Sequence, residues 1–298
     1  MCIRDSIGQP LDIAPIAAGI PELVKNLGPH SAEAAEGIMT TDTKRKEIAV
    51  SFTVGGKECR IGGICKGSGM IHPNMCTMLG FVTTDVNISK EMLQKCVSAD
   101  VVDSFNMISV DGDTSTNDTL LVLANGMAGN EEITAEGEDY DNFCKALHEI
   151  TTFLAKKMAG DGEGCTRLWE VTVKGTKTKQ DAVTLSKSVI SSNLVKTAIY
   201  GKDANCGRVL CALGYAGVEF DPEVVDLTLQ AGGEEMLWIK NGVLTDFDEE
   251  KATEMMGMDK VMQFQGAVKS FSIFMPYYEN AGKAEQFMYH LRDSYSIA

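Results

Sequence analysis

The sequence predicts a mixed α/β protein, of the α/β or α+β class, in which helices cover mixed sheets. Three observations carry this prediction. Runs rich in β-branched residues are mixed with a few long helices, without the regular βαβ alternation of a nucleotide-binding sheet. Apolar residues make up 44% and charged residues 23% of the 298 residues, which is typical of a globular chain. A chain of this length can bury a large core without metal or disulfide support.

The predicted strands are short apolar runs that contain β-branched or aromatic residues and are bounded by polar or glycine-containing segments. They cover residues 47–54, 77–83, 105–110, 119–124, 167–173, 207–213, 224–229 and 236–240. The third and fourth of these runs are joined by DGDTSTND, a polar stretch that is typical of a loop between two strands.

The clearest helix is predicted over residues 139–159, where apolar residues recur at steps of three or four. They are Phe143, Leu147, Ile150, Leu154 and Met158. The glycine-containing stretch GDGEG that follows is typical of a helix end. Ser89 is predicted to cap a helix that ends near Val102, and Asp181 to cap a second one. A short acidic helix is expected over residues 248–258.

Charge and composition exclude several classes of protein. Lysines and arginines number 27 and aspartates and glutamates 42, so the net charge is −15, and no nucleic-acid partner is expected. No run of 18 or more apolar residues predicts a membrane span. The nine cysteines include no CxxC pair, and the four histidines lack zinc-site spacing. We therefore expect reduced, mostly buried thiols in a cytosolic protein that holds no metal.

Residues 62–85, GGICKGSGMIHPNMCTMLGFVTTD, combine flexible glycines with a lysine, a proline and a threonine. The order Lys66-Gly67-Ser68 excludes a P-loop, where lysine follows glycine, and no Gly-x-Ser-x-Gly elbow surrounds Ser68. The hydroxyl of Thr77 could attack the carbonyl before it and cut the chain. The new terminal threonine would then use its own α-amine as a base. The alternative is that Thr77 only begins a strand, a role for which threonine is well suited.

The same segment resembles the processing segment of the ornithine acetyltransferase / N-acetylglutamate synthase family, whose pattern is close to KGSGMIxPNMATML. Residues 66–79 reproduce that pattern with cysteine in place of the alanine. Four further stretches resemble blocks of the same family in the same order. They are GIMTTDT (37–43), NDTLLVLANGMAG (117–129), GDGEGCTRLWEVTVKG (160–175) and SNLVKTAIYGKDANCGRVLCALGYAG (192–217). The resemblance covers roughly residues 7 to 250.

The resemblance implies roles for individual residues. The implied catalytic residues are Thr77, Lys66 and Glu163, and the implied substrate-binding residues are Thr43, Lys66, Thr77 and Glu163. Thr77 falls on the nucleophile, and the bond between Cys76 and Thr77 falls on the one that the family cuts. Glu163 falls on a glutamate that faces the nucleophile, where an acid suits a substrate amino group or a proton transfer. Thr41 is the near alternative to Thr43.

The resemblance also implies how the chain is organised. The expected architecture is a layered sandwich of mixed sheets and helices around a self-cleaved chain, with a smaller second lobe. Residues 1–6 (MCIRDS) fit poorly and are expected to be a sequence artefact. Residues 7–76 are expected to be the C-terminal part of an α-chain whose upstream portion is missing. Residues 77–298 are expected to be a β-chain, with a main catalytic lobe followed by a smaller C-terminal lobe. The family's oxyanion-hole block has no counterpart here, and the tail MYHLRDSYSIA lacks the family's terminal asparagine and threonine.

The implied function is an acetyltransferase of arginine biosynthesis in the cytoplasm. It would move acetyl from N-acetylornithine to Thr77 and then to glutamate, in a ping-pong cycle without a metal or organic cofactor. Acetyl-CoA is an alternative acetyl donor as a co-substrate. The expected partners are these small molecules and the other chain of an α/β pair that assembles into a homo-oligomer, with no membrane and no nucleic acid. Two alternatives stay open: a self-processing aminopeptidase or amidase, and an inactive remnant that lacks its oxyanion hole.

Overall fold

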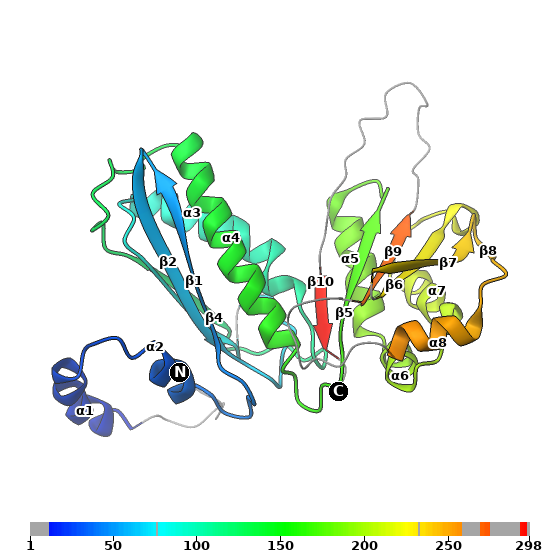
Figure 1. The fold of residues 1–298 in the computed structure, drawn as a ribbon, viewed down its shortest axis with the longest axis horizontal. Helices are drawn as coiled ribbons and strands as arrows, with labels where there is room; N and C mark the ends of the chain where they lie inside the picture. The colour runs from blue at the N-terminus through cyan, green and yellow to red at the C-terminus, as the bar shows by residue number, and fades with distance from the viewer. Residues whose placement is uncertain (1–11, 76, 232, 258–268, 275–292, 297–298) are drawn as a thin grey trace. The chain divides into compact units, whose positions relative to one another are not determined.

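The structure is a computed structural model that describes residues 12–75, 77–231, 233–257, 269–274 and 293–296. The chain folds into two compact units, each with its own sheet (Figure 1). The first unit comprises Met1–Asn106 with Asp113–Met158, and the second comprises Met107–Gly112 with Ala159–Ala298. Both sheets combine parallel and antiparallel pairs with helices, so the predicted mixed α/β class is confirmed.

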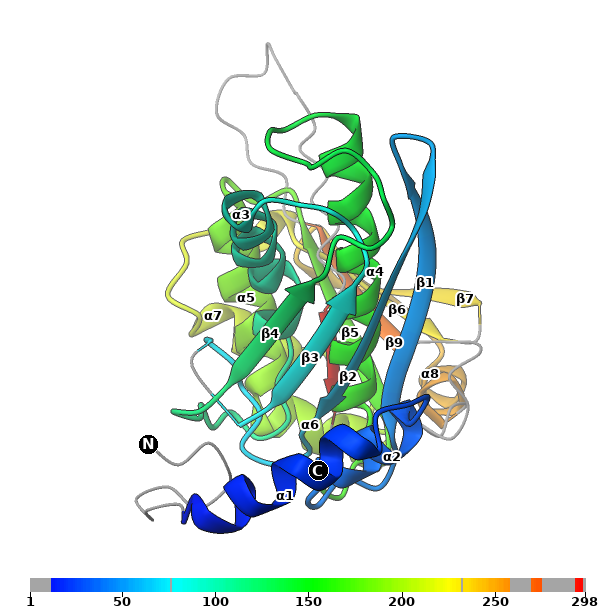
Figure 2. The same ribbon diagram turned by 90° about the vertical axis from the view of Figure 1, so that its left-hand side faces the viewer.

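The first unit contains a four-stranded sheet in the order β1-β2-β3-β4 (Figure 2). Its strands are β1 (Lys46–Val54), β2 (Lys57–Lys66), β3 (Leu79–Thr84) and β4 (Thr119–Ala124). The first three strands pair antiparallel, and β4 runs parallel to β3. The predictions of strands over 47–54, 77–83 and 119–124 are thus confirmed, while β2 was not predicted. Two short helices, α1 (Ala14–Lys25) and α2 (Ser31–Gly37), precede the sheet.

The helix predicted over residues 139–159 is α4 (Glu138–Ala159), and it covers one face of this sheet. A Cβ atom added at Gly63 in β2 would lie 3.0 Å from Leu154 and 3.1 Å from Ile150. The glycine therefore allows α4 to approach the strand closely, at a distance that a side chain would prevent. At the other end of the helix, the rings of Phe143 and Phe52 in β1 are 6.2 Å apart.

Helix α3 (Lys90–Asp100) begins at the predicted cap, because the hydroxyl of Ser89 accepts a hydrogen bond from the backbone N–H of Met92 at 3.3 Å. The end of α3 is tied to α4 by a contact of 2.7 Å between His148 Nδ1 and the Asp100 carboxylate. Helices α3 and α4 therefore lie side by side.

The predicted strand over residues 105–110 is wrong. Two 3-10 turns, η1 (Val101–Asp103) and η2 (Phe105–Met107), occupy this region. The hydroxyl of Ser104 donates to the backbone oxygen of Asp100 at 3.0 Å, so the chain keeps turning after α3. Because the run from residue 107 to residue 110 is buried throughout, its apolar residues reflect burial rather than an extended backbone.

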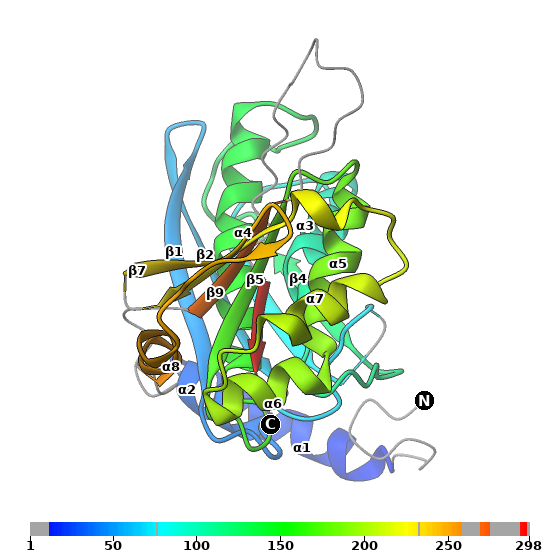
Figure 3. The ribbon, with the colours of Figure 1, turned by 90° about the vertical axis from the view of Figure 1, so that its right-hand side faces the viewer.

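The second unit contains a six-stranded sheet in the order β10-β5-β9-β6-β7-β8 (Figure 3). Its strands are β5 (Leu168–Lys174), β6 (Asp226–Ala231), β7 (Glu234–Lys240), β8 (Val243–Leu244), β9 (Lys269–Phe274) and β10 (Asp293–Ser296). Its helices are α5 (Lys179–Ser191), α6 (Asn193–Gly201), α7 (Cys206–Gly214) and α8 (Glu249–Gly257), with a short turn η3 (Pro222–Val224). Helices α5, α6 and α7 are grouped beside β5.

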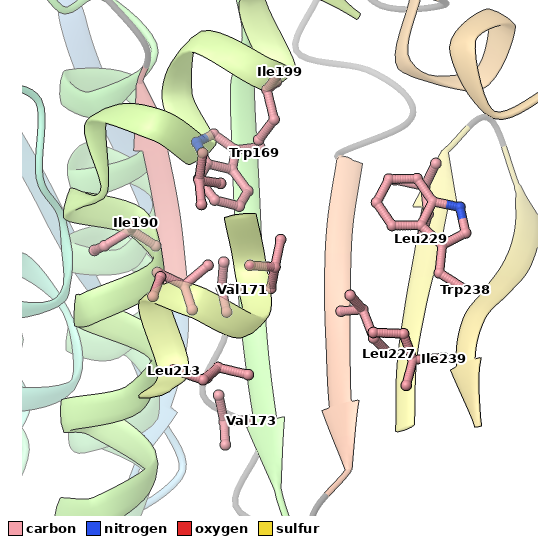
Figure 4. Packing of buried hydrophobic residues seen from close by; sticks show 14 of the residues in the cluster. Trp169, Val171, Val173, Ile190, Ile199, Leu213, Leu227, Leu229, Trp238 and Ile239 are labelled. Atoms are coloured by element: carbon pink, nitrogen blue, oxygen red, sulfur yellow. The ribbon is translucent and has the colours of Figure 1, made fainter. Parts of the chain in front are cut away.

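The core of the second unit lies between its sheet and these helices (Figure 4). Alternate residues of β5, namely Trp169, Val171 and Val173, are at most 1% exposed and belong to the same cluster as Ile190 of α5 and Leu213 of α7. Strands β6 and β7 extend this cluster, to which they contribute buried leucines, an isoleucine and Trp238. None of the helices in the described ranges is long and apolar enough to cross a bilayer.

Two local predictions in this unit are wrong. Residues 207–213 form helix α7 and not a strand, because Asn205 caps it by accepting the backbone N–H of Arg208 at 3.2 Å. The helix α5 is capped by Thr178, whose hydroxyl accepts the N–H of Asp181, so Asp181 is inside the first turn rather than at the cap. The strands predicted over 167–173, 224–229 and 236–240 and the helix predicted over 248–258 are confirmed.

Removing the Leu154 side chain should destabilise the first unit. We expect Leu154→Ala to lower the free energy of unfolding by about 2–5 kcal/mol, because this fully buried side chain fills the space opposite Gly63. Urea unfolding measures the loss. Leu121→Ala, at a leucine of β4 that is 44% exposed, is the control and should change stability by less than about 1 kcal/mol. Equal losses in the two variants would contradict the described position of α4.

Candidate active site

The segment around Thr77 connects two neighbouring strands of the first unit. β2 ends at Lys66, and in the antiparallel register Lys66 lies opposite Leu79, the first residue of β3. The two ends of the connecting segment are therefore adjacent, although they are separated along the chain. Thr77 precedes β3 by two residues and is half-buried. Cys76, on the other side of the predicted cleavage bond, lies outside the described residues.

The lysine predicted to lie next to the substrate is buried and faces the threonine-rich segment before β1. The side chain of Lys66 is 3% exposed, and its Nζ donates to the hydroxyl of Thr40 at 3.5 Å. The hydroxyls of Thr41 and Ser68 are 2.5 Å apart and share a hydrogen bond. Thr43, the predicted substrate contact, is exposed in the same stretch. The fold thus brings Lys66 together with the segment that contains both threonine candidates.

A buried carboxylate holds these two segments in place. Asp42 Oδ1 accepts hydrogen bonds from Lys46 Nζ at 2.6 Å and from the backbone N–H of Gly67 at 2.7 Å, and Oδ2 accepts the N–H of Thr40 at 3.2 Å. Burial opposes ionisation of Asp42, but the Gly67 N–H and the Lys46 ammonium outweigh it and lower the pKa of the carboxyl. Because Asp42 stays charged, it fixes the residue that directly follows Lys66.

Only glycine fits at position 67. A Cβ atom there would lie 2.8 Å from Ile71 Cδ1 and 3.0 Å from Met158 Sδ, and the backbone has φ of +152°. Both features disfavour any side chain. The glycine between Lys66 and Ser68 thus lets the chain turn tightly against α4, where Met158 lies in the last turn.

Met78, the residue after Thr77, is hydrogen-bonded through both its backbone N–H and its backbone oxygen. Asp118 Oδ1 accepts the backbone N–H of Met78 at 3.0 Å, and the N–H of Thr119 donates to the backbone oxygen of Met78 at 3.0 Å. Asp118 directly precedes β4 and Thr119 is its first residue, and β4 runs parallel to β3. The backbone just after Thr77 is therefore fixed by the neighbouring strand.

The segment before Thr77 is held as well. The hydroxyl of Thr114 donates to the backbone oxygen of His72 at 2.9 Å, and the side-chain oxygen of Asn106 accepts the N–H of Met75 at 3.0 Å. Met75 and Met70 have φ of +21° and +54°, a region that residues with a side chain seldom adopt. The loop around Thr77 is thus fixed in an unfavourable backbone conformation.

The third predicted catalytic residue belongs to the second unit. Glu163 is exposed in a tight turn between α4 and β5, closed by a hydrogen bond of 2.8 Å from the N–H of Cys165 to the oxygen of Gly162. The remaining candidates that the structure describes, Thr43, Lys66 and Thr77, all lie in the first unit.

Two acidic residues at this site were missed in the sequence. Asp42 and Asp118 lie inside the TTDT and NDT stretches, where only Thr43 and Thr41 were predicted as site residues. Asp118 is 8% exposed, and its Oδ2 is buried without a hydrogen-bond partner in the described part of the chain. Burial raises the pKa of Asp118 to about 6, although the Met78 N–H lowers it in part. For Asp118, the available signal in the sequence is a polar residue placed directly before an apolar strand.

The part of the chain that the structure describes contains no group of three histidine, cysteine, aspartate or glutamate side chains that could hold a metal ion. The described cysteines are free thiols, of which Cys59, Cys65 and Cys96 are buried.

Comparison with known proteins relates this chain to proteins that are named for arginine biosynthesis. The family model described as the ArgJ family matches residues 5–268. The chain belongs to the ArgJ family. A crystal structure of the arginine biosynthesis bifunctional protein ArgJ from Bacillus halodurans is similar, with a TM-score of 0.61 and 42% identity. The similarity covers 67% of this chain and 89% of that chain.

Curated relatives are named either ArgJ or glutamate N-acetyltransferase. The arginine biosynthesis bifunctional protein ArgJ of Thermotoga neapolitana is 48% identical to this chain, and the glutamate N-acetyltransferase of Methanocaldococcus jannaschii is 49% identical. Each match covers 86% of this chain and 64% of the relative. The chain thus spans less than two thirds of the length of these relatives.

Replacing the buried carboxylate should destabilise the site in a pH-dependent manner. We expect Asp42→Asn to lower the free energy of unfolding at pH 7 by about 3–5 kcal/mol, because the buried Lys46 ammonium loses its partner. The folded-state pKa of Asp42 is lowered, so its contribution is present above the ordinary aspartate pKa of about 3.9 and is lost as the pH falls through the folded-state value. The difference between wild type and variant should therefore shrink in acid.

Urea unfolding at a series of pH values measures this effect. The matched control is Glu58→Gln, which removes an exposed ion pair of 3.1 Å with Arg60 and should change stability little at any pH. A pH-independent difference for Asp42→Asn would show that the charge of Asp42 does not stabilise the fold.

Proposed function

We propose that this chain belongs to a glutamate N-acetyltransferase of arginine biosynthesis, which moves acetyl from N-acetylornithine to glutamate through an acetyl ester on Thr77. The observation that carries the proposal is the family match over residues 5–268, which includes the whole Thr77 segment. The names of the relatives with 48% and 49% identity support the same activity. We further propose a cytoplasmic location and an assembly of several copies of a cleaved chain pair.

The first step of the proposal is self-cleavage between Cys76 and Thr77. The Thr77 hydroxyl attacks the carbonyl of Cys76, the peptide becomes an ester, and water then releases Thr77 with a free α-amine. The hydrogen bonds of Met75 and Met78 support this step, because they fix the backbone on both sides of the bond. The positive φ of Met75 adds backbone strain of the order of 1–3 kcal/mol, part of which is released when the peptide bond opens.

The second step is acetyl transfer. The Thr77 hydroxyl attacks the acetyl carbonyl of N-acetylornithine, and the carbon–nitrogen bond breaks to release ornithine. The Thr77 α-amine takes the hydroxyl proton and passes it to the departing amine, since a free α-amine has a pKa of about 7.7–8.0. The amino group of glutamate then attacks the ester, which yields N-acetylglutamate and restores Thr77. Acetyl-CoA could acylate the same hydroxyl as an alternative donor.

The proposal gives the other candidate residues roles in this reaction. Lys66 is buried at the end of β2, opposite the start of β3, which suits a cation that stabilises developing negative charge near Thr77. Thr43, or Thr41 close to it, would contact the substrate. Glu163 would bind a substrate amino group or transfer its proton.

Replacing the nucleophile tests both steps. We expect Thr77→Ala to leave the full-length protein uncut and without acetyl transfer, because no hydroxyl is available. Thr77→Ser keeps the hydroxyl and should still cut, more slowly. Intact-mass analysis with N-terminal sequencing of the fragments measures the cut. Cleavage of Thr77→Ala at the same bond would exclude Thr77 as the nucleophile.

Withholding glutamate separates the acetyltransferase from an amidase of similar design. With N-acetylornithine alone, we expect acetyl-Thr77 to accumulate, because the ester waits for an amine acceptor. Adding glutamate should discharge it and produce N-acetylglutamate. Mass analysis of the Thr77-containing fragment follows the ester. Rapid loss of the ester to acetate without glutamate would favour an aminopeptidase or amidase, in which water is the acceptor.

A further inference from the structure

Self-cleavage before Thr77 needs a base that the later reaction does not need. During acetyl transfer the free α-amine of Thr77 can accept the hydroxyl proton. Before the cut this nitrogen is part of the peptide bond to Cys76, and an amide nitrogen is not basic. Another group must therefore accept the proton from the Thr77 hydroxyl and return a proton to the nitrogen when the bond breaks.

Asp118 is a carboxyl held against the backbone that directly follows Thr77. Its Oδ1 accepts the N–H of Met78 at 3.0 Å, and this nitrogen is bonded to the carbonyl carbon of Thr77. The carboxyl is thus held at the backbone N–H of the residue after Thr77, directly before β4 begins beside β3. Thr119 completes the attachment through its N–H to the Met78 oxygen. The carboxyl cannot move away without breaking its hydrogen bond to Met78.

The second oxygen of Asp118 is available for a proton. Asp118 is 8% exposed, and its Oδ2 is buried with no hydrogen-bond partner among the described residues. Leaving a carboxylate oxygen buried and unbonded is unfavourable. A neutral asparagine could accept the Met78 N–H equally well through its amide oxygen. The hydrogen bond alone therefore does not explain why an ionisable acid is buried at this position, and such groups in a catalytic cleft often have a chemical role.

Among the described residues, the segments next to Asp118 contain few titratable groups. Strands β3 and β4 contain none, Lys66 ends β2, His72 lies in the loop before Thr77, and Asp113 lies in the loop before β4. Burial raises the pKa of Asp118, the Met78 N–H lowers it in part, and the resulting pKa is about 6. A carboxylate with such a pKa is mostly ionised at neutral pH, yet it is more basic than an ordinary aspartate.

We propose that Asp118 is the general base, and then the general acid, of the self-cleavage step. Its carboxylate accepts the proton of the Thr77 hydroxyl while the oxygen forms a bond to the carbonyl carbon of Cys76. When the tetrahedral intermediate collapses, the bond from that carbon to the Thr77 nitrogen breaks. The carboxylic acid gives its proton to the nitrogen, so the products are an ester and a free α-amine, and the carboxylate is regenerated. This inference rests on the proposed cleavage before Thr77.

The test follows cleavage of the full-length precursor, refolded from urea between about pH 5 and pH 8, by intact mass over time. For wild type we expect the rate to rise with pH and to level off above a midpoint near 6. A rate without this midpoint would overturn the role of Asp118 as base, whatever its variants do. Asp118→Asn keeps an acceptor for Met78 but loses the charge, and it should cut about 10²–10⁴ times more slowly. Asp113→Asn, at an exposed aspartate of the same loop, should cut like wild type.

Hydroxylamine identifies which half-reaction fails, because it cleaves an ester faster than an ordinary amide. We expect hydroxylamine not to speed the slow cleavage of Asp118→Asn, since the ester does not accumulate in this variant. Faster release of fragments from this variant in hydroxylamine, or a cleavage rate equal to that of wild type, would overturn the proposal and leave the proposed function intact. A wild-type chain that never cuts before Thr77 would instead overturn the proposed cleavage, and this inference with it.

Discussion

The site depends on the burial of one charged carboxylate. Asp42 and its partner Lys46 have side chains that are at most 1% exposed, and a charge in such a place is tolerated only when it is fully paired. Asp42 satisfies this requirement with donors from Thr40, Lys46 and Gly67. Those donors belong to two segments that are far apart along the chain. The position of the Lys66-Gly67-Ser68 stretch is therefore set by the need to pair this charge.

The sequence predicted those elements of the fold whose pattern is long or flanked by clear signals. Five apolar residues at helical spacing define α4 over 22 residues, and Ser89 marks the start of α3. Short apolar runs do not distinguish a strand from a buried helix. GRVLCAL could be a strand or a buried helix, and the cap at Asn205 decides for the helix. Strand β2 was missed because its charged first half and its two glycines hide the strand pattern.

The site could be predicted from the sequence only where a dense motif marks it. Lys66 and Thr77 lie within a single motif, so a resemblance was sufficient to single them out. Asp42 and Asp118 depend on contacts with Gly67 and Met78, which lie 25 and 40 residues away. No local pattern indicates that a carboxylate will be buried against a backbone N–H so far along the chain. Only the tertiary structure shows their partners.

The pairing of β2 with β3 has a consequence for how the protein assembles. Six paired positions join these strands, from Ile61 with Thr84 to Lys66 with Leu79, and any cut before Thr77 falls between them. A cut would turn this sheet from an intrachain structure into an interface between two polypeptides. Pairing β2 with β3 then becomes a bimolecular event, so refolding after complete unfolding would depend on protein concentration. A chain cut in this way would have folded once as a single precursor, and the cut protein would persist mainly because it unfolds slowly.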